Sequence, residues 1–379
     1  MELTVQIRTG GYTGDPSDLT QVLDAIRDVF ARLPVSRVIM GWCVLPEVYQ
    51  QAASIVHDLG AELYLWLPMF SENGLLRDCS PVIGLSGQES RPYQLDDSEN
   101  FDFYCPNSPV NQSALLSLYD EYFAGIGFDG VFLDKIRYPS LINGLDGGLG
   151  CFCPNCLTAY DEAGIDIDAL RSRISALPYL ETPFGVSDYQ TGRYVFTDSL
   201  WDNFFSLRQS IVSVALRNQC AALRQLGLKI GLDVFAPFLS QFVGQDITLL
   251  SQLADFIKPM MYSATLAPAG LPFETAALLR ATGMEDDPRS YYRIIGFDPT
   301  IQPFDLYFCA REIEALRQAC ICPIHPGIEL NRIPGVAPTT TEYVSRCLDA
   351  YEGAPGLVLS WNLLNMPANH LDTVAARFR

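Results

Sequence analysis

Short apolar runs, rich in β-branched and aromatic residues, alternate along the chain with longer segments of helical periodicity. In the segment 18–33, apolar residues recur at a spacing of three or four, which places them on one face of a helix. Further helices are predicted at 46–60, 113–127, 200–226, 247–255, 306–319, 340–353 and 369–378. The apolar runs predict eight strands, at 3–8, 37–42, 62–68, 130–134, 229–235, 256–262, 323–330 and 356–362.

This succession of strand–helix units predicts an α/β protein that forms a (β/α)8 TIM barrel as a single domain over 1–379. An open doubly wound sheet is the alternative, but TGGYTG after the first strand is not the glycine-rich turn of a dinucleotide site. Long insertions follow strands three, four and six. Two of them, 71–128 and 140–198, are expected over the C-terminal face of the barrel, where barrel enzymes place their active sites.

The charge balance excludes several classes of partner. With 25 basic and 44 acidic residues the net charge is −19, a balance that repels nucleic acids and anionic lipids. No run approaches the ~18–20 apolar residues of a membrane span, and MELTVQIRTGGY lacks the basic and apolar regions of a secretory signal. We therefore expect a cytoplasmic protein without a nucleic-acid or membrane partner. The oligomeric state stays open.

Three acidic side chains interrupt the apolar runs at the ends of predicted strands. Asp134 ends the fourth strand, Asp233 lies late in the fifth, and Glu329 ends the seventh. A buried carboxylate is costly without a partner, so three at one rim of a barrel indicate either charge pairing or catalysis. Paired carboxylates suit glycoside hydrolysis, in which one protonates the leaving oxygen and the other attacks the anomeric carbon or activates water. We predict these three acids as the catalytic residues.

Aromatic and basic residues also gather at the predicted strand ends. The aromatic ones are Trp42, Trp66, Phe70, Tyr138, Phe235, Phe238, Tyr262 and Trp361, and the basic ones are Arg8, Lys135, Arg137, Lys258 and Arg332. Each aromatic residue alone is compatible with the core, but together they offer flat apolar surfaces for sugar rings. The basic residues either neutralise the acids or bind an anionic sugar. We predict substrate-binding roles for Arg8, Trp42, Trp66, Arg137, Tyr138, Tyr262 and Trp361.

The stretch GFDGVFLDKIRYPS, which runs through the fourth strand, resembles a signature of uncharacterised glycoside-hydrolase-like TIM-barrel families. GLDVFAPFLSQFVGQDITLLSQLADFIKPMMY and the closing GLVLSWNLLNMP are similar to later parts of the same families, so the resemblance covers most of the chain. It implies a barrel glycosidase with Asp134 as the strand-four acid, beside Arg137 and Tyr138. In one large superfamily of barrel glycosidases the acid at this strand end is the nucleophile. In another the acid at the end of strand four is the proton donor, and a glutamate on strand seven is the nucleophile. The roles of Asp134 and Glu329 therefore stay open.

Three of the eleven cysteines lie within six residues, as Cys151, Cys153 and Cys156 in GLGCFCPNCLTAY. C-x-x-C is a common half of a tetrahedral zinc site, for which Cys105 or Cys79 offers a fourth ligand. Structural zinc, free thiols and a disulfide all remain compatible with this spacing. Most other cysteines sit singly in apolar surroundings, which is typical of buried thiols in a reduced compartment.

Together these features predict a glycoside hydrolase that acts on an oligosaccharide or glycoside, with a carbohydrate as its partner. The carboxylate chemistry requires no cofactor, and the three histidines are scattered, which argues against a catalytic metal. Two alternatives remain: a non-catalytic carbohydrate-binding TIM barrel, and a metal-assisted barrel hydrolase or a lyase. A close pair of rim carboxylates favours the glycosidase, an aromatic groove without such a pair favours the binding protein, and a metal held at the rim favours the third class.

Overall fold

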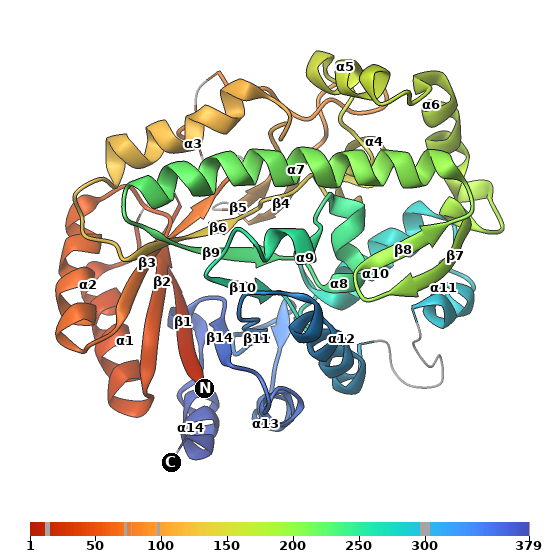
Figure 1. The fold of residues 1–379 in the computed structure, drawn as a ribbon. Helices are drawn as coiled ribbons and strands as arrows, with labels where there is room; N and C mark the ends of the chain where they lie inside the picture. Colours follow the sequence, from red (N-terminus) through yellow and green to blue (C-terminus); the bar gives the residue numbers. More distant parts are fainter. Residues whose placement is uncertain (12–15, 72–73, 77, 97–98, 296–303, 379) are drawn as a thin grey trace.

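The computed structural model describes residues 1–11, 16–71, 74–76, 78–96, 99–295 and 304–378, so part of the predicted insertion 71–128 lies outside the described residues. Eight parallel strands form one sheet in the order β10-β9-β6-β3-β2-β1-β14-β11. The two end strands meet through parallel bridges that join Ile257 to Ile324 and Met260 to Gly327. The sheet therefore closes on itself, and the predicted (β/α)8 TIM barrel is confirmed (Figure 1).

The barrel strands are short and almost wholly buried, as expected for a parallel sheet covered by helices. They are β1 Glu2–Arg8, β2 Val35–Gly41, β3 Glu62–Pro68, β6 Gly130–Asp134, β9 Lys229–Val234, β10 Phe256–Pro259, β11 Gly327–Glu329 and β14 Gly356–Ser360. Four strands are shorter than predicted: β9 and β14 end one and two residues early, and β10 and β11 are shortened more. β10 ends at Pro259, which has no N–H, while the amide of Met260 still donates to Val234 on β9. The N–H that Pro259 lacks would point toward β11, and β10 and β11 are joined there only by isolated bridges.

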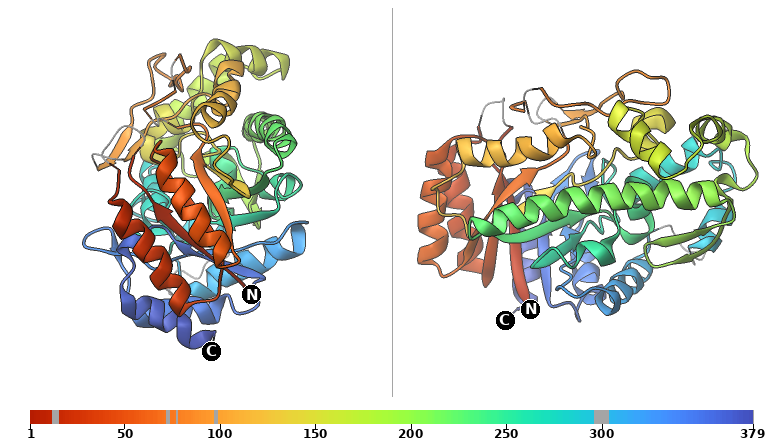
Figure 2. Two further views of the ribbon diagram at one scale, coloured as in Figure 1. Left: turned by 90° about the vertical axis from the view of Figure 1, so that its left-hand side faces the viewer. Right: turned by 45° about the horizontal axis from the view of Figure 1, so that its top comes forward.

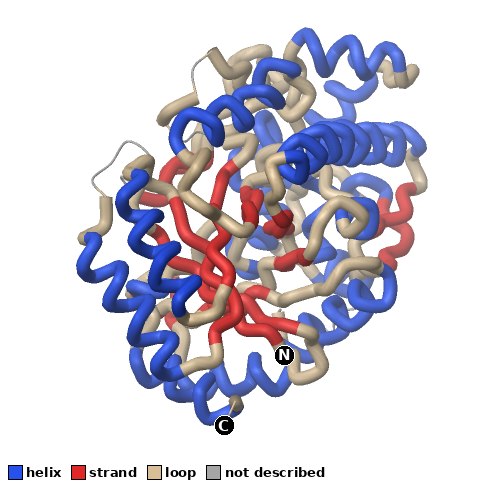
Figure 3. Tube along the Cα trace, turned by 60° about the vertical axis from the view of Figure 1, so that its left-hand side comes forward, coloured by secondary structure: helices blue, strands red, loops and turns tan. Residues whose placement is uncertain are grey.

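Helices surround the strands on the outside of the barrel (Figure 3). Those predicted from the sequence are α1 Leu19–Arg32, α2 Pro46–Asp58, α3 Pro109–Tyr122, α7 Ser199–Gln225, α9 Ile247–Leu250, α12 Leu306–Ala319, α13 Thr341–Ala350 and α14 Ala368–Arg377. In α1, Asp18 caps the first turn by accepting a hydrogen bond from the amide of Gln21 at 2.9 Å, and the predicted apolar face is buried. The two termini lie near each other, because the chain starts on β1 and ends on α14, which follows β14, the strand that pairs with β1 (Figures 1 and 2).

The long connections carry elements that the sequence pattern did not predict. After β3 come β4 Tyr93–Asp96 and β5 Glu99–Phe101, and after β6 come η1 Leu141–Asn143, α4 Gly144–Gly148, α5 Pro154–Glu162, α6 Ile167–Ala176, η2 Leu177–Tyr179, η3 Pro183–Gly185, β7 Val186–Gln190 and β8 Arg193–Phe196. Later connections hold α8 Pro237–Ser240, η4 Gln241–Val243, α10 Leu271–Ala281, α11 Arg289–Ile294, β12 Arg332–Ile333, β13 Ala337–Pro338 and η5 Leu363–Asn365. The long helix α7 runs outside the barrel from the β7–β8 hairpin back to β9 (Figure 2).

These connections leave the C-terminal ends of their strands, which is the end of a TIM barrel that carries function. None of the described helices is long and apolar enough to cross a membrane.

Candidate active site

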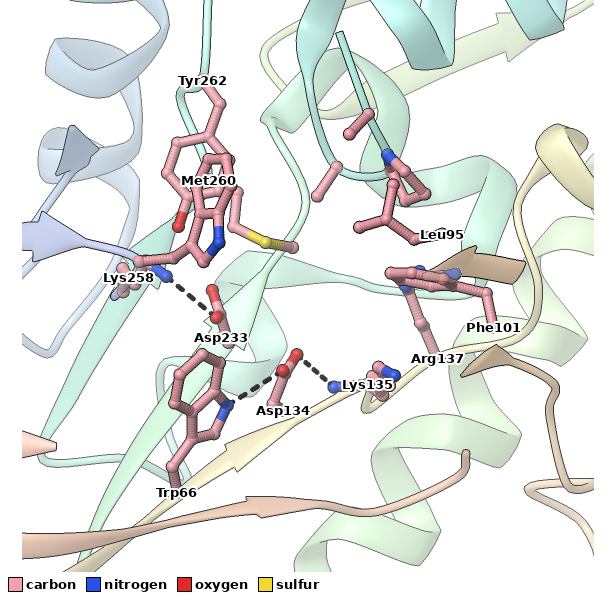
Figure 4. Close-up of a pocket in the computed structure, with 14 residues that line it drawn as sticks. Trp66, Leu95, Phe101, Asp134, Lys135, Arg137, Asp233, Lys258, Met260 and Tyr262 are labelled. Atoms are coloured by element: carbon pink, nitrogen blue, oxygen red, sulfur yellow. Dashed lines mark hydrogen bonds and ion pairs between the residues drawn. The ribbon is translucent and has the colours of Figure 1, made fainter. Parts of the chain in front are cut away.

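A pocket opens at the C-terminal ends of the barrel strands. It encloses about 610 Å³, a volume that includes the open solvent at its mouth. Long connections form its walls, with Leu95 and Phe101 from the β4–β5 region and 267–269 from the connection after β10 (Figure 4). The other lining residues are Trp66, Asp134, Lys135, Arg137, Asp233, Lys258, Met260, Tyr262 and Trp361.

Asp134 ends β6 and is held in place through both carboxylate oxygens. Its Oδ2 accepts a hydrogen bond from Trp66 Nε1 at 3.0 Å, and its Oδ1 accepts one from the backbone amide of Lys135 at 2.5 Å (Figure 4). Trp66 reaches Asp134 because β3 lies beside β6 in the barrel. Two donors suit the ionised form, since an ionised carboxylate only accepts hydrogen bonds. Asp134 therefore presents an oriented carboxylate to the pocket.

Asp233 lies on the neighbouring strand β9 and faces the same pocket. Because Leu133 pairs with Leu232, the two aspartates that follow them lie side by side at the rim (Figure 4). Asp233 Oδ2 pairs with Lys258 Nζ at 3.0 Å, whereas its buried Oδ1 has no hydrogen-bond partner among the described residues. Burial raises the pKa of Asp233 to about 7; Lys258 opposes this rise and the charge of Asp134 adds to it.

Lys258 belongs to a polar network inside the barrel. Its Nζ also donates to Gln6 Oε1 at 2.9 Å, and the same oxygen accepts a hydrogen bond from Ser360 Oγ at 2.9 Å. Gly327 leaves room for the lysine, because a Cβ at this position would lie 2.5 Å from Lys258 Cε. The network joins strands β1, β9, β10 and β14. It fixes Lys258 against Asp233, so the aspartate is oriented from the barrel side.

Arg137 brings a second buried cation to the pocket. Its guanidinium lies 4.5 Å from the ring centroid of Phe103 and 4.3 Å from that of Phe235, and Nη1 donates to the carbonyl of Tyr138 at 3.0 Å. Burial lowers the pKa of Arg137 to about 10, against the opposing effect of Glu274 and of the two pocket aspartates. With that pKa the side chain is still charged at neutral pH. The acidic pair therefore faces positive charge in the same pocket.

Glu329, predicted as a catalytic partner of Asp134, occupies a different environment. It ends β11, is fully buried, and is not among the described residues that line the pocket. Its Oε1 accepts hydrogen bonds from the amides of Ala264 and Thr265 at 2.6 and 3.2 Å. Burial raises the pKa of Glu329 to about 7. Its bonds anchor the connection after β10, whose residues 267–269 form part of the pocket wall.

The predicted substrate-binding residues divide into two groups. Those that line the pocket are Trp66, Arg137, Tyr262 and Trp361. Trp42 lies behind the lining and packs edge-on against Trp66 with 5.1 Å between ring centroids, and the guanidinium of Arg8 lies over Trp42. Tyr138 is fully buried, with its hydroxyl 3.9 Å from Cys156 Sγ. Of the seven predicted substrate-binding residues, only the first group lines the pocket.

Several pocket residues were not predicted from the sequence. Leu95 and Phe101 come from a short β4–β5 pair in a polar stretch without a clear strand period, and 267–269 lie in a loop. Gln6, which bonds Lys258 but is not among the described lining residues, was detectable, because it interrupts an apolar strand in the same way as Asp233 does. Polar residues inside predicted barrel strands are therefore the features that sequence inspection detects best.

No protein-family model matches the sequence, and a comparison with curated proteins finds no match. Solved structures with a similar chain path include the spore cortex-lytic enzyme SleL of Bacillus megaterium QM B1551, at 9% identity and a TM-score of 0.49 over 99% of this chain and 73% of that one. A class V chitinase from Pseudomonas fluorescens Pf-5 also has 9% identity and a TM-score of 0.49, with 99% of both chains covered. At this level of similarity the function has to be inferred from the pocket itself.

Proposed function

We propose that this protein is a glycoside hydrolase whose reaction takes place between Asp134 and Asp233. The observation that supports this most is the presence of two carboxyl groups with unlike surroundings in one pocket. Asp134 accepts a hydrogen bond at each oxygen, whereas Asp233 is buried, has one unbonded oxygen among the described residues and has a pKa of about 7. Glycosidases need one carboxylate and one carboxylic acid, and unlike surroundings provide both.

In this proposal Asp233 carries the proton. A group with a pKa of about 7 is populated in both protonation states near neutral pH, so it can give a proton to the leaving oxygen and later recover one from water. Its unbonded Oδ1 is the oxygen available for this transfer, because Oδ2 is paired with Lys258. The leaving alcohol then departs neutral as the bond between the anomeric carbon and its oxygen breaks.

Asp134 is the carboxylate that acts at the anomeric carbon. Its bonds to Trp66 and to the amide of Lys135 fix its orientation, which lowers the entropy cost of reaching the reactive geometry. It either attacks the carbon directly or activates the water that does so. In both cases its negative charge stabilises the positive charge that develops on the sugar ring in the transition state.

The rest of the lining favours a carbohydrate ligand. Trp66, Phe101, Tyr262 and Trp361 give the pocket largely aromatic walls, and Arg137 and Lys258 place donors among them. Aromatic faces can cover the apolar face of a sugar ring, while fixed polar groups bind its hydroxyls. The substrate class that we propose is therefore an oligosaccharide or a glycoside.

A screen of nitrophenyl glycosides and oligosaccharides tests this function. Asp134→Asn should lose hydrolysis of any substrate that the wild type cleaves, whereas Asp233→Asn should lose it on oligosaccharides, whose leaving alcohol needs protonation, and much less on nitrophenyl glycosides. Asp286→Asn is the matched control, because Asp286 is exposed and lies outside the pocket lining. Equal turnover in Asp134→Asn and the wild type would contradict the proposal. Saturable saccharide binding without cleavage would support a carbohydrate-binding barrel instead, and turnover that depends on an added metal would support a metal-assisted hydrolase.

A further inference from the structure

Four cysteines from two separate connections converge outside the pocket lining. Cys105 belongs to the connection after β3, whereas Cys151, Cys153 and Cys156 belong to the connection after β6. All four side chains are buried, and their sulfur atoms lie within 4.8 Å of one another. The sequence left two residues open as the fourth member, and among the described residues the group contains Cys105 and not Cys79. We call this group the four-cysteine cluster.

The spacing of the sulfur atoms fits ligands around one tetrahedral ion. Cys105 Sγ lies 3.4 Å from Cys156 Sγ and 3.6 Å from Cys153 Sγ. Four thiolates at a Zn–S distance of ~2.3 Å have their sulfur atoms ~3.8 Å apart, close to these values. A disulfide would use only two of the four, and all eleven cysteines, each within the described part of the chain, are free thiols.

The surroundings of the cluster favour negative charge on sulfur. The amide of Ile83 donates to Cys151 Sγ at 3.2 Å, and the hydroxyl of Tyr138 lies 3.9 Å from Cys156 Sγ. The buried guanidinium of Arg208 lies 4.3 Å from the centre of the Tyr138 ring, with Nε and Nη1 unbonded among the described residues. A buried cation of this kind needs a nearby negative charge. Four thiolates around a divalent ion carry a net charge of about −2, which meets this need.

We propose that the four-cysteine cluster binds a structural zinc ion as a closed four-thiolate site. All four coordination positions are filled by protein and the sulfur atoms are buried, so no position is open to water or substrate. The ion joins the connection that gives the pocket Phe101 to the one that gives it Arg137. Metal binding then stabilises short elements such as α4 and α5, which have little core of their own.

Metal analysis of protein purified without chelator from zinc-supplemented cells tests the site. The wild type should contain about one zinc per chain, and Cys105→Ser/Cys156→Ser should contain less than about a tenth of that. Cys320→Ser/Cys322→Ser is the matched control, because these two cysteines lie outside the cluster, and it should keep its zinc. Zinc near zero in the wild type, or full zinc in the Cys105→Ser/Cys156→Ser variant, would overturn the proposal.

Cobalt substitution of the wild type provides a test that does not depend on the folding of a variant. Co²⁺ exchanged into a tetrahedral thiolate site gives intense visible absorption and a sulfur-to-metal charge-transfer band, and zinc should displace both signals. Weak absorption typical of octahedral cobalt would overturn the assignment of four thiolate ligands. Iron in place of zinc in the purified protein would overturn the identity of the ion. None of these readouts depends on hydrolytic activity, so the zinc site and the proposed glycosidase can fail independently.

Discussion

Asp233 and Glu329 lie at the ends of barrel strands and are both buried, and burial raises the pKa of each to about 7. Their neighbours differ. Asp233 is paired with Lys258 on one side and lines the pocket on the other, whereas Glu329 bonds to the amides of Ala264 and Thr265 and is not among the described lining residues. The raised pKa is therefore a result of burial in both residues. Access to the pocket is what makes Asp233 a candidate catalytic acid, whereas Glu329 holds the connection after β10 in place.

The largest effect is expected on the pocket side of this comparison, at Asp134. Asp134→Asn keeps the shape of the side chain but removes the charge that we propose acts at the anomeric carbon. Turnover should fall by about 10³-fold or more, as is usual for the loss of a catalytic nucleophile. Steady-state kinetics on a cleaved nitrophenyl glycoside measure this loss, and circular dichroism checks that the fold is retained. Turnover within a factor of about three of the wild type would remove Asp134 from the mechanism.

Asp233→Asn removes the proposed proton donor, so its effect should depend on the leaving group. We expect a loss of about 10²–10⁴-fold on a glycoside whose leaving alcohol needs protonation, and a much smaller loss on one with an activated nitrophenol. Comparing the two substrates in the same variant measures this difference. A loss of equal size on both substrates would show that Asp233 does not act as the acid.

Trp66→Phe sharpens the account of how Asp134 is oriented. The change keeps an aromatic ring but removes the Nε1–H that donates to Asp134 Oδ2. A hydrogen bond to a charged group is worth ~1.5–3 kcal/mol, so the turnover number should fall by about tenfold or more. Trp42→Phe is the matched control, because Trp42 Nε1 has no hydrogen-bond partner among the described residues. Equal effects of the two substitutions would contradict a specific role for the Trp66 hydrogen bond.

Glu329→Gln should have the smallest effect on turnover, because the amide side chain retains an oxygen that can accept from Ala264 and Thr265. Its effect on stability depends on pH. The folded protein holds a proton on Glu329 up to a pKa of about 7, whereas the ordinary value is 4.5. The contribution of Glu329 to the free energy of unfolding is therefore fully present below pH 4.5 and is lost as the pH rises through about 7.

Urea unfolding at pH 4 and pH 8 measures this contribution. The decrease in unfolding free energy between these two pH values should be smaller in Glu329→Gln than in the wild type by about 3 kcal/mol. Asp233 titrates over a similar range in both proteins, so the difference between them isolates Glu329. Glu329→Gln could instead show the same decrease in unfolding free energy as the wild type, or lose as much turnover as Asp233→Asn. Either result would contradict the different roles that we assign to Glu329 and Asp233.

The barrel was predictable from the sequence because each buried strand is a distinct apolar run between helical periods. The acids at strand ends were predictable for the same reason, since Asp134, Asp233 and Glu329 each interrupt such a run. The access of each acid to the pocket was not predictable. It depends on the connection after β10, where the amides of Ala264 and Thr265 bond Glu329, and these contacts link residues far apart in the sequence.

The elements missed in the long connections lack a strong local pattern. β4, β5, β7 and β8 are strands of three to five residues in two-stranded pairs, too short for a clear alternation of polar and apolar positions. Helix α10 had a weak but usable signal, because Pro272 opens its first turn after Gly270. Pocket walls built by such segments, including Leu95 and Phe101, become visible only in the folded structure.

The central claim is that Asp233, and not Glu329, is the acid of an Asp134–Asp233 pair. The most direct test is the pH dependence of kcat/KM in the wild type, Asp233→Asn and Glu329→Gln on one cleaved glycoside, because this quantity reports the ionisation of the free enzyme. Activity of the wild type should fall as the pH rises through about 7, where Asp233 loses its proton. Glu329→Gln should keep this fall, and the residual activity of Asp233→Asn should lack it. If kcat/KM of Glu329→Gln no longer decreased as the pH rises, while that of Asp233→Asn still did, the result would contradict the account and assign the acid to Glu329.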